Sequence, residues 1–180
     1  MKKQNGIADR KKTRDSMLLM GFLLIAFIVI CIVFGGRIMD LVSGKKIVGK
    51  DIRSEDITDF YYTYSSSTYP PDYQRYRFYA EDGNHYFYHE KREGDHWPLT
   101  EEDITLSGTK ELSAEEWNEF FAYLAGGTVQ NRSDDVIDGD AGPWLYLYWK
   151  GDHGTMQEFT FASWEKEKEF EAYCLRMMEQ

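Results

Sequence analysis

The sequence MLLMGFLLIAFIVICIVF, residues Met17–Phe34, decides how this chain is organised, because it contains no charged residue and no proline. As an α-helix with a rise of about 1.5 Å per residue it would be roughly 27 Å long, close to the hydrocarbon thickness of a bilayer. The run without charged residues extends from Ser16 to Gly36. We therefore predict a single transmembrane helix over residues 17–36, in contact with the lipid bilayer through Met17–Phe34.

Three other interpretations of this stretch are less well supported. A cleaved secretory signal normally has an apolar run of about 7 to 15 residues and small residues before the cleavage point. Here the run is longer, and its best cleavage site, Val33–Gly35, has valine where alanine is preferred. A lipid-modified Cys31 would need a small residue before it, and Ile28–Ile30 supplies none. A helix in a soluble core would have a polar face, so an uncleaved membrane anchor is favoured.

The charged residues on either side of the apolar stretch indicate its orientation. Residues 1–16 contain six lysines and arginines and two aspartates, and four more basic residues follow between residues 37 and 50. Basic residues near a membrane span tend to stay in the cytoplasm. We therefore predict that residues 1–16 are a cytoplasmic tail. The protein is then expected in the cell membrane, as a single-pass protein with its C-terminal domain outside the cytoplasm.

The part of the chain after the apolar stretch divides into a linker and one domain. Glycines interrupt short apolar pairs in residues 37–50, which predicts a linker, and residues 51–180 are enough for one domain with its own core. This domain has 11 lysines and arginines against 28 aspartates and glutamates, a net charge of −17, whereas the whole chain has −10. Such a field disfavours nucleic acid and anionic surfaces as partners and would attract a basic one. A basic protein or a wall polymer is the expected kind of partner, although acidity is also needed simply for solubility.

Alternating aromatic residues predict antiparallel strands. In Tyr73–Ala80 and His85–Lys91 aromatic residues recur at every second position on both sides of Asp82-Gly83, a pair that suits a tight hairpin turn. A second hairpin is predicted from Trp144–Trp149 and Met156–Phe161. Three further segments are predicted as strands, the last two on weaker patterns: Ile57–Tyr64, Ile104–Leu106 and Thr128–Gln130.

Two amphipathic helices are predicted as well. Ser113 and Glu116 have the spacing of a capping box, and apolar residues follow at helical spacing until Gly126-Gly127. The second helix begins near Ser163. The residues predicted to be buried by the two helices are Trp117, Phe120, Phe121, Leu124, Phe170, Tyr173, Cys174 and Met177. The fold class expected for this domain is α+β, with a mainly antiparallel sheet and both helices packed on one face.

The residues that could bind metal do not form a known motif. His85 and His89 would lie about 13 Å apart on a strand, too far to share one zinc ion. The acidic segment Asp134–Asp140 has Val136 at the third position and Leu145 at the twelfth, where a calcium loop has oxygen ligands. An irregular calcium site there stays open as an alternative. No metal or other cofactor is predicted.

The sequence also contains no recognisable catalytic motif. A phosphate loop, a dinucleotide-binding fingerprint, a nucleophile elbow and a zinc-protease motif are all missing from it. Cys174 is expected in the core, and Cys31 lies in the apolar stretch, so the domain has no internal disulfide, as is common in exported bacterial proteins. We predict no catalytic residue and favour a non-enzymatic function.

The domain has more aromatic residues than a core requires: 13 tyrosines, 8 phenylalanines and 5 tryptophans. Leu145, Leu147 and Trp149 are predicted to be core residues, and Tyr76 and Phe78 lie on the side of their strand opposite to Tyr73 and Tyr79. The alternate positions of the same strands are also aromatic, although a sheet with one covered face needs only one apolar set. The second set must either be buried by a loop or a second layer, or be displayed on the other face as a binding surface for sugar, peptide or protein. Its residues are Tyr146, Tyr148, Tyr73 and Tyr79.

These observations together predict a membrane-anchored extracytoplasmic module that binds a ligand without catalysing a reaction. Two alternatives remain. The net charge of −17 and the small size would suit an immunity-type inhibitor that neutralises a basic toxin or hydrolase in the cell-wall space. A cell-wall-active enzyme is the other alternative, and it would need a cleft that holds two buried carboxylates.

Overall fold

The computed structural model describes residues 44–131, 142–152 and 157–179. The chain divides into two units, residues 1–43 and residues 44–180, and the described residues all belong to the second. The predicted cytoplasmic tail and transmembrane helix lie outside the described residues, as does the acidic segment Asp134–Asp140. No helix in the described part of the chain is long and apolar enough to cross a membrane.

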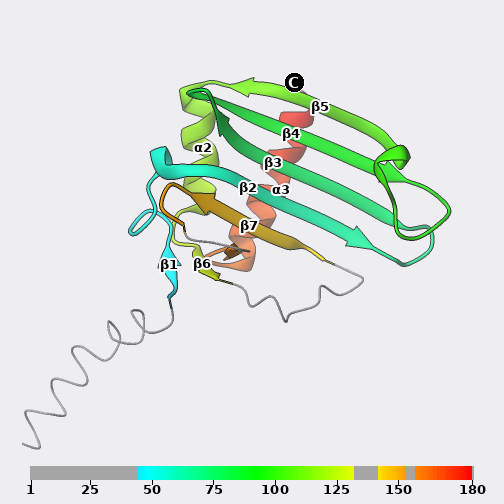
Figure 1. The fold of residues 1–180 in the computed structure, drawn as a ribbon, viewed down its shortest axis with the longest axis horizontal. Coiled ribbons are helices and arrows are strands. Elements are labelled where there is room, and N and C mark those ends of the chain that lie inside the picture. The colour runs from blue at the N-terminus through cyan, green and yellow to red at the C-terminus, as the bar shows by residue number, and fades with distance from the viewer. Residues whose placement is uncertain (1–43, 132–141, 153–156, 180) are drawn as a thin grey trace, which may run out of the picture. The chain divides into compact units, whose positions relative to one another are not determined.

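The second unit is built on one sheet of eight strands in the order β1-β6-β8-β7-β2-β3-β4-β5 (Figure 1). Neighbouring strands are antiparallel throughout. The strands are β1 (Lys46–Ile47), β2 (Ile57–Ser66), β3 (Asp72–Glu81), β4 (Asn84–Glu93), β5 (Ile104–Leu112), β6 (Thr128–Asn131), β7 (Trp144–Trp149) and β8 (Gln157–Thr160). The helices are α2 (Ala114–Leu124) and α3 (Trp164–Met178), with short 3-10 turns η1 (Ser54–Asp56) and η2 (Glu101–Asp103).

The hairpin of β3 and β4 forms around the predicted turn. Glu81 pairs with Asn84, which leaves Asp82 and Gly83 as the two turn residues. Their φ angles are +51° and +85°, and a two-residue turn with both angles positive matches the right-handed twist of the strands on either side. The hairpin is confirmed, and it fixes the register of β3 against β4, two strands of ten residues each.

Both predicted helices form and are capped by the predicted serines. The Ser113 hydroxyl accepts a hydrogen bond from the Glu116 amide at 3.2 Å, and the Glu116 carboxylate accepts one from the Ser113 amide at 2.8 Å. The Ser163 hydroxyl caps α3 by accepting from the Lys166 amide at 3.3 Å. These bonds satisfy amides that have no partner inside the helix.

The two helices pack on the same face of the sheet and lie behind it in the view of Figure 1. Phe120 of α2 and Phe170 of α3 are fully buried, and both contact Phe60 and Phe78 of the sheet. The Phe78 and Phe120 rings are stacked, with centroids 4.1 Å apart. The α+β class, the mainly antiparallel sheet and the placement of the helices are therefore confirmed.

At the short-strand end of the sheet, the pairings made by β6 were not predicted. β1 lies inside the range predicted as linker, residues 37–50, and pairs with β6; the neighbouring Val48 is buried. The folded unit thus begins several residues before Asp51. β7 and β8 pair antiparallel, with Tyr146 opposite Glu158 among the described residues, as the predicted second hairpin requires, and β8 pairs on its other side with β6. Such pairings depend on residues far apart in the sequence, so local patterns do not indicate them.

Candidate functional site

The candidate site is the face of the sheet opposite to α2 and α3. In the described part of the chain no helix packs on this face. Leu147 is fully buried, and Leu145 and Trp149 pack against the core, while Tyr146 and Tyr148 point to the other face and are half-buried. This confirms the predicted division of β7. We call the following half-buried residues the aromatic face: Tyr61, Tyr73, Tyr79, Tyr86, Tyr88, Trp144, Tyr146 and Tyr148.

Arginine and tyrosine side chains alternate along this face. Side chains at every second position of β3 share one side of the sheet, and there the sequence has Tyr73, Arg75, Arg77 and Tyr79. Each guanidinium carbon lies 4.3–5.9 Å from the centroids of the tyrosine rings beside it. This distance range is that of cation–π attraction. We call the resulting row the cation–π ladder; in order, it consists of Arg92, Tyr73, Arg75, Tyr61, Arg77, Tyr79 and Tyr86.

One carboxylate neutralises Arg77. The Nε of Arg77 donates to Oδ1 of Asp59 at 3.0 Å, and its Nη2 donates to Oδ2 at 2.6 Å. The Tyr61 hydroxyl donates to the same carboxylate at 3.0 Å. The hydrogen bond with Asp59 raises the pKa of Arg77. Asp59 thus holds Arg77 and Tyr61 in fixed positions within the ladder.

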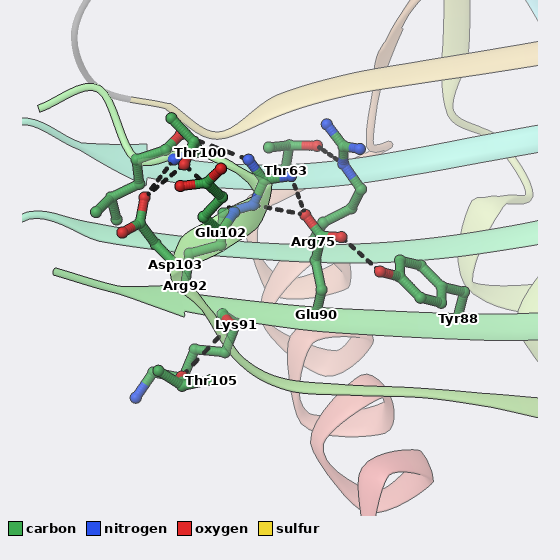
Figure 2. Close-up of polar contacts among 11 residues, drawn as sticks. Thr63, Arg75, Tyr88, Glu90, Lys91, Arg92, Thr100, Glu102, Asp103 and Thr105 are labelled. Carbon is green, nitrogen blue, oxygen red and sulfur yellow. Dashed lines mark hydrogen bonds and ion pairs between the residues drawn. The ribbon is translucent and has the colours of Figure 1, made fainter.

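A second, more deeply buried carboxylate neutralises Arg92 (Figure 2). Side-chain exposure is only 11% for Arg92 and 5% for Glu90. Arg92 donates to Oε1 of Glu90 from Nε at 3.0 Å and from Nη2 at 2.6 Å, and the Tyr88 hydroxyl donates to Oε2 at 2.5 Å. Burial alone would raise the pKa of Glu90, but the hydrogen bonds from Tyr88 and Arg92 and the charge of Arg92 outweigh it and hold the pKa below its ordinary value.

The connection between β4 and β5 closes this end of the face. The Arg92 Nη1 donates to the Leu99 carbonyl at 3.4 Å, and the Leu99 side chain is buried. Thr100 and Asp103 form a capping box for η2, with the Thr100 amide donating to Asp103 at 2.6 Å. Figure 2 shows this box beside the Arg92 side chain. Arg92, a residue of the cation–π ladder, therefore connects the ladder to the loop between β4 and β5.

Arg75 differs from the other two arginines of the ladder. Its Nε donates to the Thr63 hydroxyl at 3.3 Å, and its guanidinium lies between the Tyr61 and Tyr73 rings. No carboxylate among the described residues forms an ion pair with it. In Figure 2 its two terminal nitrogens have no interaction with the residues drawn. Arg75 therefore has donors available for a ligand.

Arg75 lines an open concavity of about 750 Å³ on the aromatic face. Tyr61, Tyr146 and Tyr148 line it too, as do Thr63 and Asp59. The Tyr61 and Tyr148 rings meet edge to face with centroids 6.3 Å apart, an arrangement favoured by their quadrupoles. Rings and a guanidinium group thus form the floor of a depression of the size that binding sites have.

The structure brings the predicted surface residues to one face but gives them different places. Tyr146 and Tyr148 line the concavity, whereas Tyr73 and Tyr79 belong to the ladder, on either side of its arginines. Sequence reasoning missed Tyr61 and the arginines. The alternation of Tyr73, Arg75, Arg77 and Tyr79 was a usable signal, because residues of one parity share a face.

The histidines and the cysteine of the described residues lie elsewhere. His85 stacks on Trp117 at 4.0 Å, and burial lowers the pKa of both His85 and His89. His96 lies 3.2 Å from Asp103. Cys174 is a core residue, as predicted, and burial raises the pKa of its thiol. In the described ranges no three histidine, cysteine or acidic side chains gather as metal ligands.

The aromatic face offers stacking surfaces, oriented donors and a shallow depression, which are the elements of a recognition surface. No protein-family model, curated protein or solved structure matches the chain.

Proposed function

We propose that this protein is a binding module, anchored in the cell membrane by residues 17–36, which displays its aromatic face outside the cytoplasm. The observation that carries the proposal is the set of half-buried rings and arginines on a sheet face without a covering helix. Tyrosine, tryptophan and arginine are the residues enriched at the energetically important centres of protein interfaces. The rings of this face are already held by their neighbours, so little conformational entropy would be lost when a partner binds.

The carboxylates of the face favour binding over catalysis. Asp59 and Glu90 are each held by an arginine. Hydrolysis of a glycosidic bond by paired carboxylates requires one of them to remain protonated near neutral pH, and thus to have a raised pKa. The pKa of Glu90 is lowered instead. These groups are therefore suited to fix the geometry of a surface, and a cell-wall enzyme is the weaker alternative.

Cysteine labelling in intact cells tests the membrane topology. Glu115 is exposed on α2, so Glu115→Cys would place a reactive thiol on the domain surface, while the native Cys174 is buried and should stay unlabelled. A membrane-impermeant maleimide should label Glu115→Cys in intact cells and Asn5→Cys only after permeabilisation. The reverse pattern would show that the proposed orientation is wrong.

Site-specific photo-crosslinking tests the binding face. A photoreactive phenylalanine analogue in place of Tyr79 or Tyr148 should give adducts in intact cells. The same analogue at Glu115 or Glu119, on the other side of the domain, should give none. Adducts confined to the α2 positions would show that partners bind the helix layer and that the aromatic face is not the site.

A second candidate function, the immunity-type inhibitor, is favoured by where the acidic residues lie. Helix α2 has three glutamates and no basic residue, and the connection 94–103 has four acidic residues and no lysine or arginine. A basic toxin or hydrolase would then bind through long-range attraction that salt weakens. A pull-down at low salt that recovered only neutral or acidic proteins would exclude this candidate.

A further inference from the structure

We infer that the concavity on the aromatic face binds a peptide segment of a partner protein through a carboxylate, and that Arg75 is its receptor. This inference rests on the proposed function and adds the chemistry of the ligand. It starts from a difference among three arginines on one face. Arg77 and Arg92 each have a carboxylate partner, at 2.6 Å in both cases, and Arg75 has none among the described residues.

The position of Arg75 indicates that its carboxylate partner would be supplied by a ligand. Its Nε is held by Thr63 and its plane lies between two tyrosine rings, so the guanidinium is already oriented. Glu90 is near enough for the charge of Arg75 to lower its pKa, but its hydrogen bonds are with Tyr88 and Arg92. The terminal nitrogens of Arg75 remain available, and a guanidinium group presents such donors in the geometry of a carboxylate.

The acidic residues of the concavity would not repel such a ligand at Arg75. Asp59 is neutralised by Arg77, and Asp152 accepts a hydrogen bond from the Trp149 amide at 2.9 Å. Asp152 lies at the end of β7 that pairs with the start of β2, whereas Arg75 pairs with Thr63. Four residues along β2, from Asp59 to Thr63, span about 13 Å. The charges of Asp152 and Arg75 therefore lie at opposite ends of the concavity.

The composition of the face favours a peptide over a polysaccharide as the source of the carboxylate. In the described structure the face has eight aromatic residues and three arginines, and no lysine belongs to it. Aromatic residues and arginine are enriched at protein interfaces, and lysine is depleted there. The rings of Tyr61, Tyr146 and Tyr148 would contact the residues next to the acidic one.

A selection experiment with the full-length protein in lipid nanodiscs tests the inference. A displayed library of random peptides is selected on the unaltered protein, on Arg75→Gln and on Arg176→Gln, an exposed α3 arginine whose loss changes the net charge equally. The unaltered protein and Arg176→Gln should enrich peptides with aspartate or glutamate beside an apolar residue. Arg75→Gln should lose the acidic preference but still enrich aromatic peptides.

The affinities of one selected peptide and of its Glu→Gln form are then measured. Their comparison gives the contribution of the ion pair between Arg75 and the peptide carboxylate. Arg75→Gln should weaken binding of the acidic peptide roughly 10- to 100-fold, the effect of one hydrogen-bonded charge pair, and leave the amide peptide nearly unaffected. Arg75→Lys keeps the charge but loses the fork of donors, so an intermediate affinity is expected. Circular dichroism of both variants checks that the fold is retained.

The outcomes separate this inference from the proposed function. Peptides without any acidic preference, or equal acidic preference on Arg75→Gln, would overturn the role of Arg75 and leave a binding face. Binding of polygalacturonate with no peptide enriched would assign the carboxylate to a polysaccharide and overturn the peptide assignment. Enrichment of nothing, with no polygalacturonate binding, would overturn both the inference and the binding face.

Discussion

Replacement of Arg92 by glutamine should be among the most destabilising single changes on the sheet face. The substitution removes both hydrogen bonds from the guanidinium to Glu90 and leaves this carboxylate 5% exposed without its cation. It also removes the contact with the Tyr73 ring at 4.3 Å and the bond to the Leu99 carbonyl. The loop over this end of the face then loses its connection to the ladder.

The expected loss of stability follows from these contacts. Removing one partner of a buried ion pair typically costs about 3–5 kcal/mol, because the remaining charge has lost its solvent and its partner. Glu90 would keep the hydrogen bond from Tyr88, so we expect the lower end, about 3 kcal/mol. A domain of this size has a free energy of unfolding of about 5–15 kcal/mol, so the variant should fold but be clearly weakened.

A double variant separates the buried charge from the lost contacts. Glu90→Gln/Arg92→Gln removes the uncompensated charge and leaves two neutral amides that can hydrogen-bond. It should therefore be more stable than Arg92→Gln alone, by about 1–2 kcal/mol, because the effects of substitutions within one network do not add. Equal stability of the single and the double variant would contradict this account.

The pH dependence provides a second test, with a definite sign. In the unaltered protein the pKa of Glu90 is lower in the folded than in the unfolded state. Ionised Glu90 therefore contributes stability that is present above the unfolded pKa of about 4.3 and is lost as the pH falls through the folded pKa. In Arg92→Gln the burial of Glu90 is no longer compensated, so its protonation should cost less stability or even restore some. The difference in the free energy of unfolding between the unaltered protein and Arg92→Gln should thus become smaller as the pH is lowered.

Urea unfolding of the full-length protein in detergent micelles, followed by tryptophan fluorescence, measures these differences. The slope of the free energy against urea should be unchanged, since the surface exposed on unfolding is nearly the same. A loss below about 1 kcal/mol at neutral pH would refute the reasoning, because the value would be that of a solvated surface pair.

Three further predictions concern the core, a helix cap and the buried thiol. Phe78→Ala should lower the free energy of unfolding in urea by about 3–5 kcal/mol, because the fully buried Phe78 ring contacts both helices. A decrease near 1 kcal/mol would mean that the neighbouring side chains fill the space or that the ring is poorly packed. Ser113→Ala should lower the free energy of unfolding by about 1 kcal/mol in thermal unfolding, because it removes the cap of α2. An unchanged stability would show that another group replaces the hydroxyl. Cys174 should react with a thiol reagent only as fast as the domain unfolds, because it is buried and its pKa is raised; fast labelling of the native protein would contradict its place in the core.

The elements that were predictable from the sequence are those whose signals are local. The capping box of Ser113 and Glu116 and the turn at Asp82-Gly83 depend on residues within four positions of one another, and both formed as predicted. β1 has only two residues and depends on Val129, more than eighty positions away. β5 was predicted only in part, because an edge strand pairs on one side and needs fewer apolar residues.

The candidate site was predictable as a face but not as a set of contacts. Alternation placed Tyr146 and Tyr148 opposite the core because parity alone decides the face of a strand. Arg77 has a carboxylate partner and Arg75 has none because of the residues of β2 that lie opposite them. Arg75 lies opposite Thr63, whereas Arg77 lies opposite Tyr61 and reaches Asp59, two positions away. That register follows from the tertiary pairing of β2 with β3, which no local pattern indicated.

The cation–π ladder also bears on the accuracy of folding. Strand β3 has aromatic residues on both sides, so hydrophobicity alone would tolerate a one-residue slip against β2. Such a slip exchanges the two sides of the strand and would turn Arg75 and Arg77 toward the phenylalanines beneath the helices, where an unpaired charge costs several kcal/mol. Misaligned hairpins would thus remain rare and short-lived. The arginines would discriminate against wrong pairings during folding even when no ligand is bound.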